Sequence, residues 1–174
     1  MGKFFDLDSP IMRTLNRLAD LMWLNILTLL CCLPIITAGA SLTAMHYVLL
    51  KMVRNEESYI SRAFFKSFKE NFKQATLLWL IMLVVIAIMG ADYWILRTAT
   101  DFPRVLVIVI GAVGVFLYMF SQYIFPLQSK FSNTIRGTIK NAALMSILGF
   151  PRTIGMTAAS FVPLLLLYLF DIRV

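Results

Sequence analysis

Few residues in this sequence could do chemistry, and those few lie inside long apolar stretches. His46 is the sole histidine, while Asp92 and Asn25 interrupt otherwise apolar runs. Ionisable residues at membrane depth can relay protons or bind cations, metals or substrate. The plainer interpretation, which we favour, places His46 and Asp92 near the membrane boundary. It expects the Asn25 amide to bond to another helix or to the broken backbone between Pro34 and Gly39.

Enzyme chemistry needs groups that this sequence does not supply. It has no Gly-Lys-Ser/Thr phosphate loop, no serine in a nucleophile elbow and no converging pair of carboxylates. Cys31 and Cys32 are adjacent, which rarely suits a disulfide, and two thiols are too few for a thiolate metal site. We therefore expect no catalytic residues, no metal site, no cofactor and no enzyme activity.

The composition is that of a membrane protein. Of 174 residues, 60% are hydrophobic and 14% charged, against about 45–50% and 25% in soluble domains. The net charge of +7 comes from bases that lie between apolar runs, which argues for a bilayer and against nucleic acid as the partner. The sequence predicts an all-α, polytopic membrane helical bundle, formed as a single membrane domain over residues 1–174.

Hydrophobic periodicity divides this domain into segments. Ser9 and Pro10 predict a helix start, so an amphipathic interfacial helix is expected over about 9–20. A broken apolar segment follows over 21–50. Three further spans are expected over about 75–96, 105–127 and 154–170. The chain stops directly after the last span, and we expect it to be shortened at its C-terminus.

The segment 21–50 is too long for one span and too short for two. Pro34 and Gly39 interrupt it, with Thr37 and Ser41 beside them. It forms either one long kinked span or a re-entrant hairpin, and the bases near the N-terminus slightly favour the hairpin. In both cases residues 34–41 should be buried against neighbouring helices or line a cavity. The candidate polar and hinge residues within the membrane are Asn25, Pro34, Thr37, Gly39, Ser41, His46 and Asp92.

Basic loops give an orientation. Six Lys/Arg lie in 51–73 and four in 128–152, but two in 97–104, so the first two loops are expected to be cytoplasmic. Phe64, Phe68 and Phe72 recur every four residues, which predicts an interfacial helix with phenylalanines toward lipid chains and lysines toward phosphates. The candidate partner or lipid surface comprises Arg13, Asn16, Arg17, Asp20, Lys66, Lys69 and Lys73.

Four stretches resemble the YesL family of bacterial membrane proteins, a domain of unknown function. They are residues 5–10 (FDLDSP), 15–21 (LNRLADL), 32–41 (CLPIITAGAS) and 64–76 (FFKSFKENFKQAT). Such proteins are commonly encoded beside ATP-driven carbohydrate uptake systems, and they often carry a further apolar segment and a basic tail. The resemblance implies no catalytic residues.

Two functions follow as expectations. The first is a non-catalytic accessory or regulatory subunit of carbohydrate uptake in the bacterial cell membrane, with carbohydrate permease subunits as partners. The alternative is an independent transporter or channel for small solutes or ions, acting as a homo-oligomer.

Overall fold

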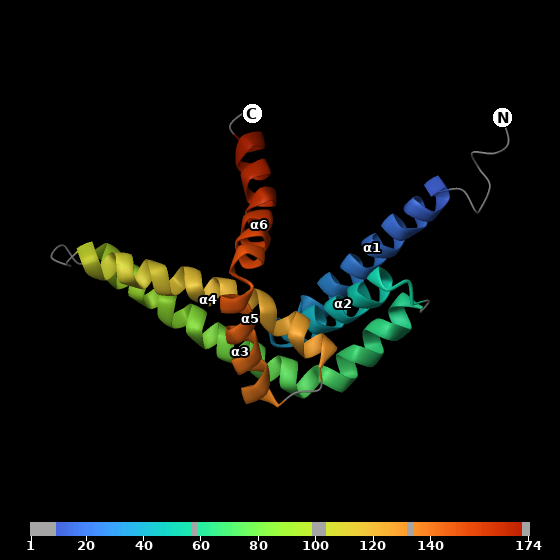
Figure 1. The fold of residues 1–174 in the computed structure, drawn as a ribbon, viewed down its shortest axis with the longest axis horizontal. Helices are drawn as coiled ribbons and strands as arrows, with labels where there is room; N and C mark the ends of the chain where they lie inside the picture. The colour runs from blue at the N-terminus through green and yellow to red at the C-terminus, as the bar shows by residue number, and fades with distance from the viewer. Residues whose placement is uncertain (1–9, 57–58, 99–103, 132–133, 172–174) are drawn as a thin grey trace. The chain divides into compact units, whose positions relative to one another are not determined.

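The computed structural model describes residues 10–56, 59–98, 104–131 and 134–171, and nearly all of them are helical (Figure 1). The elements are α1 (Pro10–Cys32), the short 3-10 turn η1 (Ile35–Thr37), α2 (Ala38–Val53), α3 (Ile60–Thr98), α4 (Arg104–Lys130), α5 (Ile135–Leu148) and α6 (Phe150–Asp171). The predicted all-α fold is confirmed.

Four helical segments are long and apolar enough to cross a membrane. They are Ile11–Cys32, Ile35–Val53, Ile60–Leu96 and Val105–Lys130. The last two contain the spans that the sequence predicts over 75–96 and 105–127. Helix α6 covers the predicted span 154–170, whose crossing stays a prediction. The chain is therefore a membrane-embedded, multi-pass helical protein.

Two helices continue where the sequence predicts a boundary. Helix α1 has no end near residue 20, so the expected interfacial helix and the first apolar arm are one 23-residue helix. Likewise, the phenylalanine-rich segment is the beginning of α3, which is 39 residues long. Neither glycine nor proline occurs between residues 11 and 32 or between 60 and 89, so nothing interrupts the helical hydrogen bonds there.

The chain divides into two compact units. The first unit is Met1–Ile81 with Gln128–Ser132, and the second unit is Met82–Leu127 with Asn133–Val174. Helices α3 and α4 therefore contribute to both. That the whole chain forms one domain stays a prediction.

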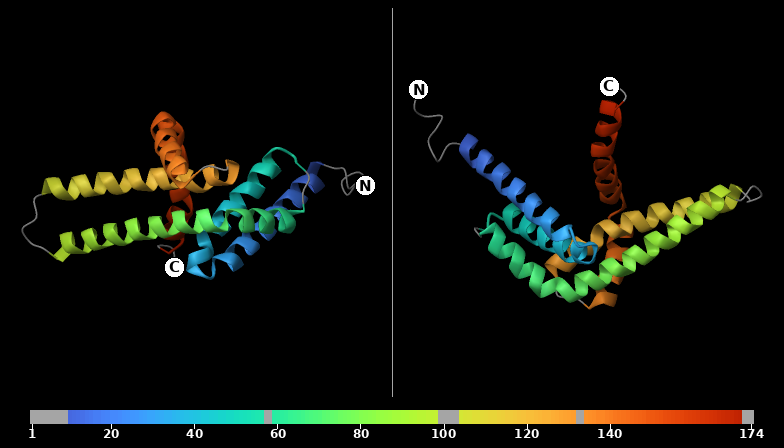
Figure 2. Two further views of the ribbon diagram at one scale, coloured as in Figure 1. Left: turned by 90° about the horizontal axis from the view of Figure 1, so that it is seen from below. Right: turned by 180° about the vertical axis from the view of Figure 1, so that it is seen from behind.

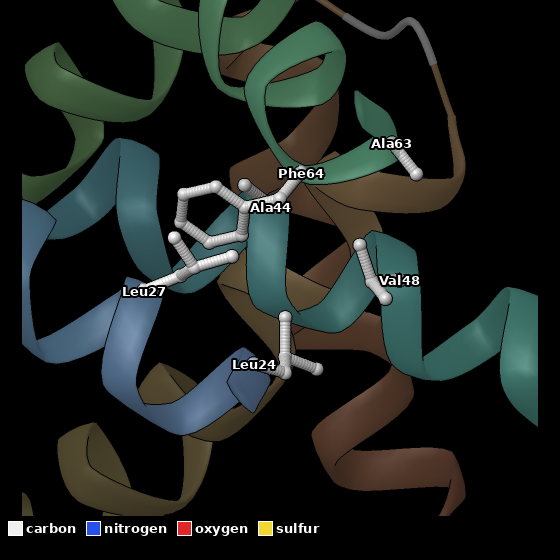
Figure 3. Packing of buried hydrophobic residues seen from close by; sticks show 6 residues of the cluster. All are labelled: Leu24, Leu27, Ala44, Val48, Ala63 and Phe64. Carbon is white, nitrogen blue, oxygen red and sulfur yellow. The ribbon is translucent and has the colours of Figure 1, made fainter. Parts of the chain in front are cut away.

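In the first unit, α1 and α2 lie side by side and run in opposite directions, joined by η1 (Figures 1 and 2). Of the two predicted architectures for the segment 21–50, this is the hairpin, and its re-entrant course through a membrane stays a prediction. The beginning of α3 packs on it, and the ring of Phe64 points toward Leu27 of α1 (Figure 3). The buried core consists of Leu24, Leu27, Ala44, Val48, Ala63 and Phe64.

In the second unit, the later part of α3 lies beside α4 (Figure 2). Two hydroxyl pairs tie α4 to α6. Tyr118 shares a hydrogen bond of 2.7 Å with Ser160, and Tyr123 one of 2.8 Å with Thr153. Polar side-chain bonds thus hold helices together here, as is common inside membranes.

Candidate functional site: the hairpin and the beginning of helix α3

The break in the hairpin is held by side chains. Pro34 cannot continue α1, and the chain turns through residues 33–37. The Thr37 hydroxyl lies 2.6 Å from the Cys31 carbonyl oxygen and 2.9 Å from that of Pro34. The Trp79 indole N–H donates to the Ile35 carbonyl at 2.7 Å. Carbonyls that the helix end leaves without an intrahelical partner are therefore bonded, which fixes the hinge.

Gly39 lets α2 touch the backbone of α3. A Cβ added there would lie 2.5 Å from the Ala75 carbonyl oxygen and 2.5 Å from the Trp79 Cβ. No side chain larger than hydrogen fits without movement of the backbone. The residue type at this position is thus set by the packing of two helices.

The prediction that residues 34–41 are buried is half right. Ala38, Gly39, Ala40 and Ser41 are buried, as expected. Leu33, Ile35 and Ile36 are exposed by 58–78% and form the tip of the hairpin. Because Thr37 and Trp79 bond carbonyls of the break, the tip can present apolar side chains to its surroundings.

Contacts between the hairpin and α3 run along the basic part of α3. The Trp23 indole N–H of α1 donates to the Ser61 hydroxyl at 2.9 Å. Phe64 lies in the shared core, and Trp79 holds the tip. The hairpin therefore lies beside residues 61–79, and its tip reaches only about one helical turn into the apolar stretch that begins at Ala75.

This placement corrects the expected role of the phenylalanines. The sequence pattern puts Phe64, Phe68 and Phe72 toward lipid chains. Instead, Phe64 is fully buried and Phe68 packs against the same core, while Phe72 is 37% exposed. The hairpin covers this face of α3, and sequence periodicity does not say which neighbour an apolar face meets.

The polar side of α1 meets the turn between α2 and α3. Arg13, Asn16, Arg17 and Asp20 are all exposed. The Arg17 guanidinium donates to the Asn55 amide oxygen at 2.6 Å. A cavity of about 650 Å³ is lined by Arg17, Asp20, Met52, Asn55, Glu56, Tyr59 and Ile60. Asn55 and Glu56 were missed by the sequence reasoning, since no local pattern links them to residues 38 positions earlier.

Asn55 shapes that turn. Its φ of 55° is left-handed, a conformation that asparagine tolerates better than most residues. The Asn55 N–H donates to the Met52 carbonyl at 3.2 Å and the Glu56 N–H to the Lys51 carbonyl at 3.1 Å. This pair of bonds is a Schellman motif, with Asn55 in the position usually taken by glycine.

The three lysines of the predicted surface separate into two groups. Lys66, Lys69 and Lys73 are all exposed, but only Lys69 and Lys73 line a second cavity of about 880 Å³. The same cavity is lined by Asn71, Gln74 and Gln128, which the sequence reasoning missed. An amide directly after the apolar run 105–127 was the available sign.

The candidate residues within the membrane have differing surroundings. Asn25 is exposed on α1, and the described structure shows no bond from its amide to another helix or to the backbone of residues 34–39, contrary to expectation. His46 and Asp92 are partly buried, in the first and second units respectively. Ser41 is fully buried, with its hydroxyl unpartnered. Among the described residues, no group of three His, Cys, Asp or Glu side chains could hold a metal ion.

A helical hairpin packed on a long, partly basic helix thus defines the first unit of this multi-pass membrane protein. A family model described as "Protein of unknown function, DUF624" matches residues 21–93, which include most of the hairpin and most of α3. Residues 21–93 are thus similar to that family, of which the YesL family is a member, and over this segment the resemblance is confirmed. No curated protein and no solved structure matches the chain.

Proposed function

We propose that this chain is a non-catalytic accessory or regulatory subunit that binds a carbohydrate permease in the bacterial cell membrane. In this proposal the loops 51–73 and 128–152 are cytoplasmic, in keeping with their Lys and Arg content. The family resemblance supports the link to carbohydrate uptake. One structural observation carries the rest: most of the surface of α1 is left uncovered.

Helix α1 is covered on one narrow face. Its buried side chains are Leu24, Leu27 and Thr28. Apolar residues on the rest of α1 are about half exposed or more, namely Ile11, Leu15, Leu18, Met22, Trp23, Ile26, Leu29 and Leu30. An apolar helix with so much free surface can pack against lipid or against a helix of another protein.

The charges beside this surface favour a protein partner. Arg13 and Arg17 lie with Asp20 on α1, and Arg54 and Glu56 form an ion pair of 3.8 Å at the end of α2. Attraction to anionic lipid requires bases alone. A surface of both signs gives register and selectivity to a protein contact, because mismatched charges on a wrong partner repel.

Site-specific photo-crosslinking in bacterial cells that co-express this chain and a carbohydrate permease of the same bacterium tests this proposal. A photoreactive residue replaces Asn16, which is exposed on α1, or Lys140, which is exposed on α5 and serves as the matched control. We expect a permease subunit to be captured from position 16 and not from position 140. Capture of no transporter subunit at position 16, in membranes where the permease complex is intact, overturns the proposal.

The alternative, an independent transporter or channel, is favoured by one observation. In the first unit, the buried hydroxyls of Ser41 and Thr76 have no partner in the described structure. A route for water or solute supplies partners to such groups when it is filled. Purified protein in liposomes tests this: flux without any partner, abolished by His46→Ala or Asp92→Asn, replaces the accessory role with the transporter role.

A further inference from the structure

The cavity of about 880 Å³ lies within the first unit, between the basic part of α3 and the end of α4. Residues 68–74 of α3 line one side, residues 128–131 line the other, and Tyr47 of α2 completes it. Its polar groups come from two helices that are more than 50 residues apart in sequence. The fold therefore assembles this site.

A chain of amide hydrogen bonds crosses the site and has a fixed direction. The Asn71 side-chain nitrogen donates to the Ser67 carbonyl at 3.1 Å, and a carbonyl can only accept. The Asn71 oxygen therefore faces the Gln128 nitrogen, 3.5 Å away, and that nitrogen also donates to the Gln74 oxygen at 2.6 Å. Gln128 is 2% exposed, so this arrangement is buried and held in place.

This chain of hydrogen bonds fixes the orientation of the Gln74 amide. Since its oxygen accepts from Gln128, its NH₂ group is the free end of the chain of amides. Gln74 is exposed and lines the cavity, and its nitrogen makes no hydrogen bond in the described structure. The site therefore offers an oriented N–H donor, and such donors suit the oxygens of an anion.

The charges around the cavity have the same preference. Lys69, Lys73 and Lys130 line it together with one acid, Glu70, which gives a formal excess of two positive charges (three minus one). Its apolar walls are aromatic and consist of Tyr47, Phe68, Phe72 and Phe131. A ligand that combines a negative phosphate with apolar groups satisfies both parts of the lining.

The position of the cavity along both helices indicates where such a ligand would come from. Its α3 residues end at Gln74, directly before the apolar stretch that begins at Ala75, and its residues 128–131 come directly after the apolar stretch 105–127 of α4. Helix residues that flank an apolar span lie at the depth of lipid headgroups, and basic pockets there bind anionic lipids. We propose that this cavity binds the phosphate of an anionic phospholipid, held by Lys69, Lys73, Lys130 and the Gln74 amide.

Binding to the purified full chain in a non-ionic detergent tests the proposal. The probes are dihexanoyl phosphatidylglycerol, dihexanoyl phosphatidylcholine and inorganic phosphate. Each probe is titrated into the protein, and its affinity is measured by the change in intrinsic fluorescence or by calorimetry. Lys69→Gln, Lys73→Gln and Lys130→Gln should each weaken phosphatidylglycerol binding about fivefold, since one base contributes about that factor near an anionic surface. Gln74→Glu should weaken it further than Gln74→Leu, because it places a carboxylate where the donor was.

Lys66→Gln is the matched control. Lys66 lies on the same side of α3, three residues before Lys69, but does not line the cavity, so binding should be unchanged. Elution volume and helical circular dichroism establish that each variant is folded. Equal weakening by Lys66→Gln and Lys69→Gln overturns the site in favour of diffuse charge attraction. Equal affinity for inorganic phosphate and phosphatidylglycerol overturns the lipid as the source, and equal affinity for phosphatidylcholine overturns the requirement for an anion.

Discussion

The first unit buries a cluster of apolar side chains drawn from three helices, whereas the second unit leaves most of its apolar side chains exposed. In the most apolar stretch of Ile35–Val53, which comprises η1 and α2, 39% of residues are buried, and in that of α1 17% are. In the most apolar stretch of α4 none are. The second unit instead joins α4 to α6 through the pairs Tyr118–Ser160 and Tyr123–Thr153.

This difference indicates which surroundings each unit is built for. A cluster like that around Phe64 resembles the interior of a water-soluble protein, where burial itself is the driving force. Helices surrounded by lipid gain little from burying apolar groups, because lipid chains are equally apolar, and they associate through packing and polar bonds. The first unit therefore has a protein-like core between helices that are themselves apolar enough to cross a membrane. The second unit relies on polar bonds between helices, as a lipid-embedded bundle does.

Phe64→Ala should have the largest effect on the stability of the first unit. Its ring is fully buried in the first unit, so the substitution should lower the free energy of unfolding by about 3–5 kcal/mol. Phe65→Ala is the control, since that neighbouring ring is 42% exposed and should matter far less. Thermal unfolding in detergent measures both. Equal losses contradict a protein-like core around Phe64.

Gly39→Ala tests the contact between α2 and α3. The new methyl group collides with the Ala75 carbonyl and Trp79, which should cost about 1–3 kcal/mol as overpacking. Gly155→Ala makes the same change in α6, where an added Cβ meets nothing within 4 Å, and there the gain in helix propensity should be neutral or stabilising. Thermal unfolding measures the loss of stability in both variants. A loss for Gly155→Ala and none for Gly39→Ala contradicts the close contact between α2 and α3.

Two substitutions of Asn55 distinguish the contribution of its backbone conformation to stability from that of its side-chain hydrogen bond. Asn55→Ala loses both the tolerance of a positive φ and the Arg17 bond, and should cost about 1–2 kcal/mol. Asn55→Gly keeps the conformation and loses only the acceptor, so it should be the milder change. If the two variants unfold alike, the left-handed turn does not contribute to stability.

The hydrogen bond between Tyr123 and Thr153 in the second unit should have the smallest effect on stability. Their hydroxyls lie 2.8 Å apart. A double-mutant cycle with Tyr123→Phe and Thr153→Val should give a coupling of about 0.6 kcal/mol, the average for such bonds in a membrane bundle. A coupling as large as the Phe64→Ala effect removes the proposed difference between the units.

The sequence predicts where the backbone of a helix must break, but it does not predict which helix or lipid an apolar helix face will contact. Pro34 and Gly39 located the break of the hairpin because backbone limits follow from residue type alone. The burial of Phe64 was unpredictable, since its spacing suits lipid and protein equally. The amide chain through Gln128 and the Arg17–Asn55 bond join distant positions, so they depend on tertiary packing that no short pattern encodes.

The hairpin lies against the basic beginning of α3, with the Trp23 indole at the Ser61 hydroxyl, and this contact can be tested directly. The Trp23 contact is made by the end of its indole, so cysteines at these two positions are joined with a short bismaleimide and not by direct oxidation. In native membranes, in a chain with Cys31→Ala and Cys32→Ala, the Trp23→Cys, Ser61→Cys pair should be crosslinked within one molecule, which mass spectrometry of the digested chain detects. Met22→Cys with Ser61→Cys is the matched control and should crosslink far less, because Met22 is 67% exposed on another face of α1. Absence of a crosslink between positions 23 and 61, or equal crosslinking of both pairs, contradicts the packing of the hairpin on α3.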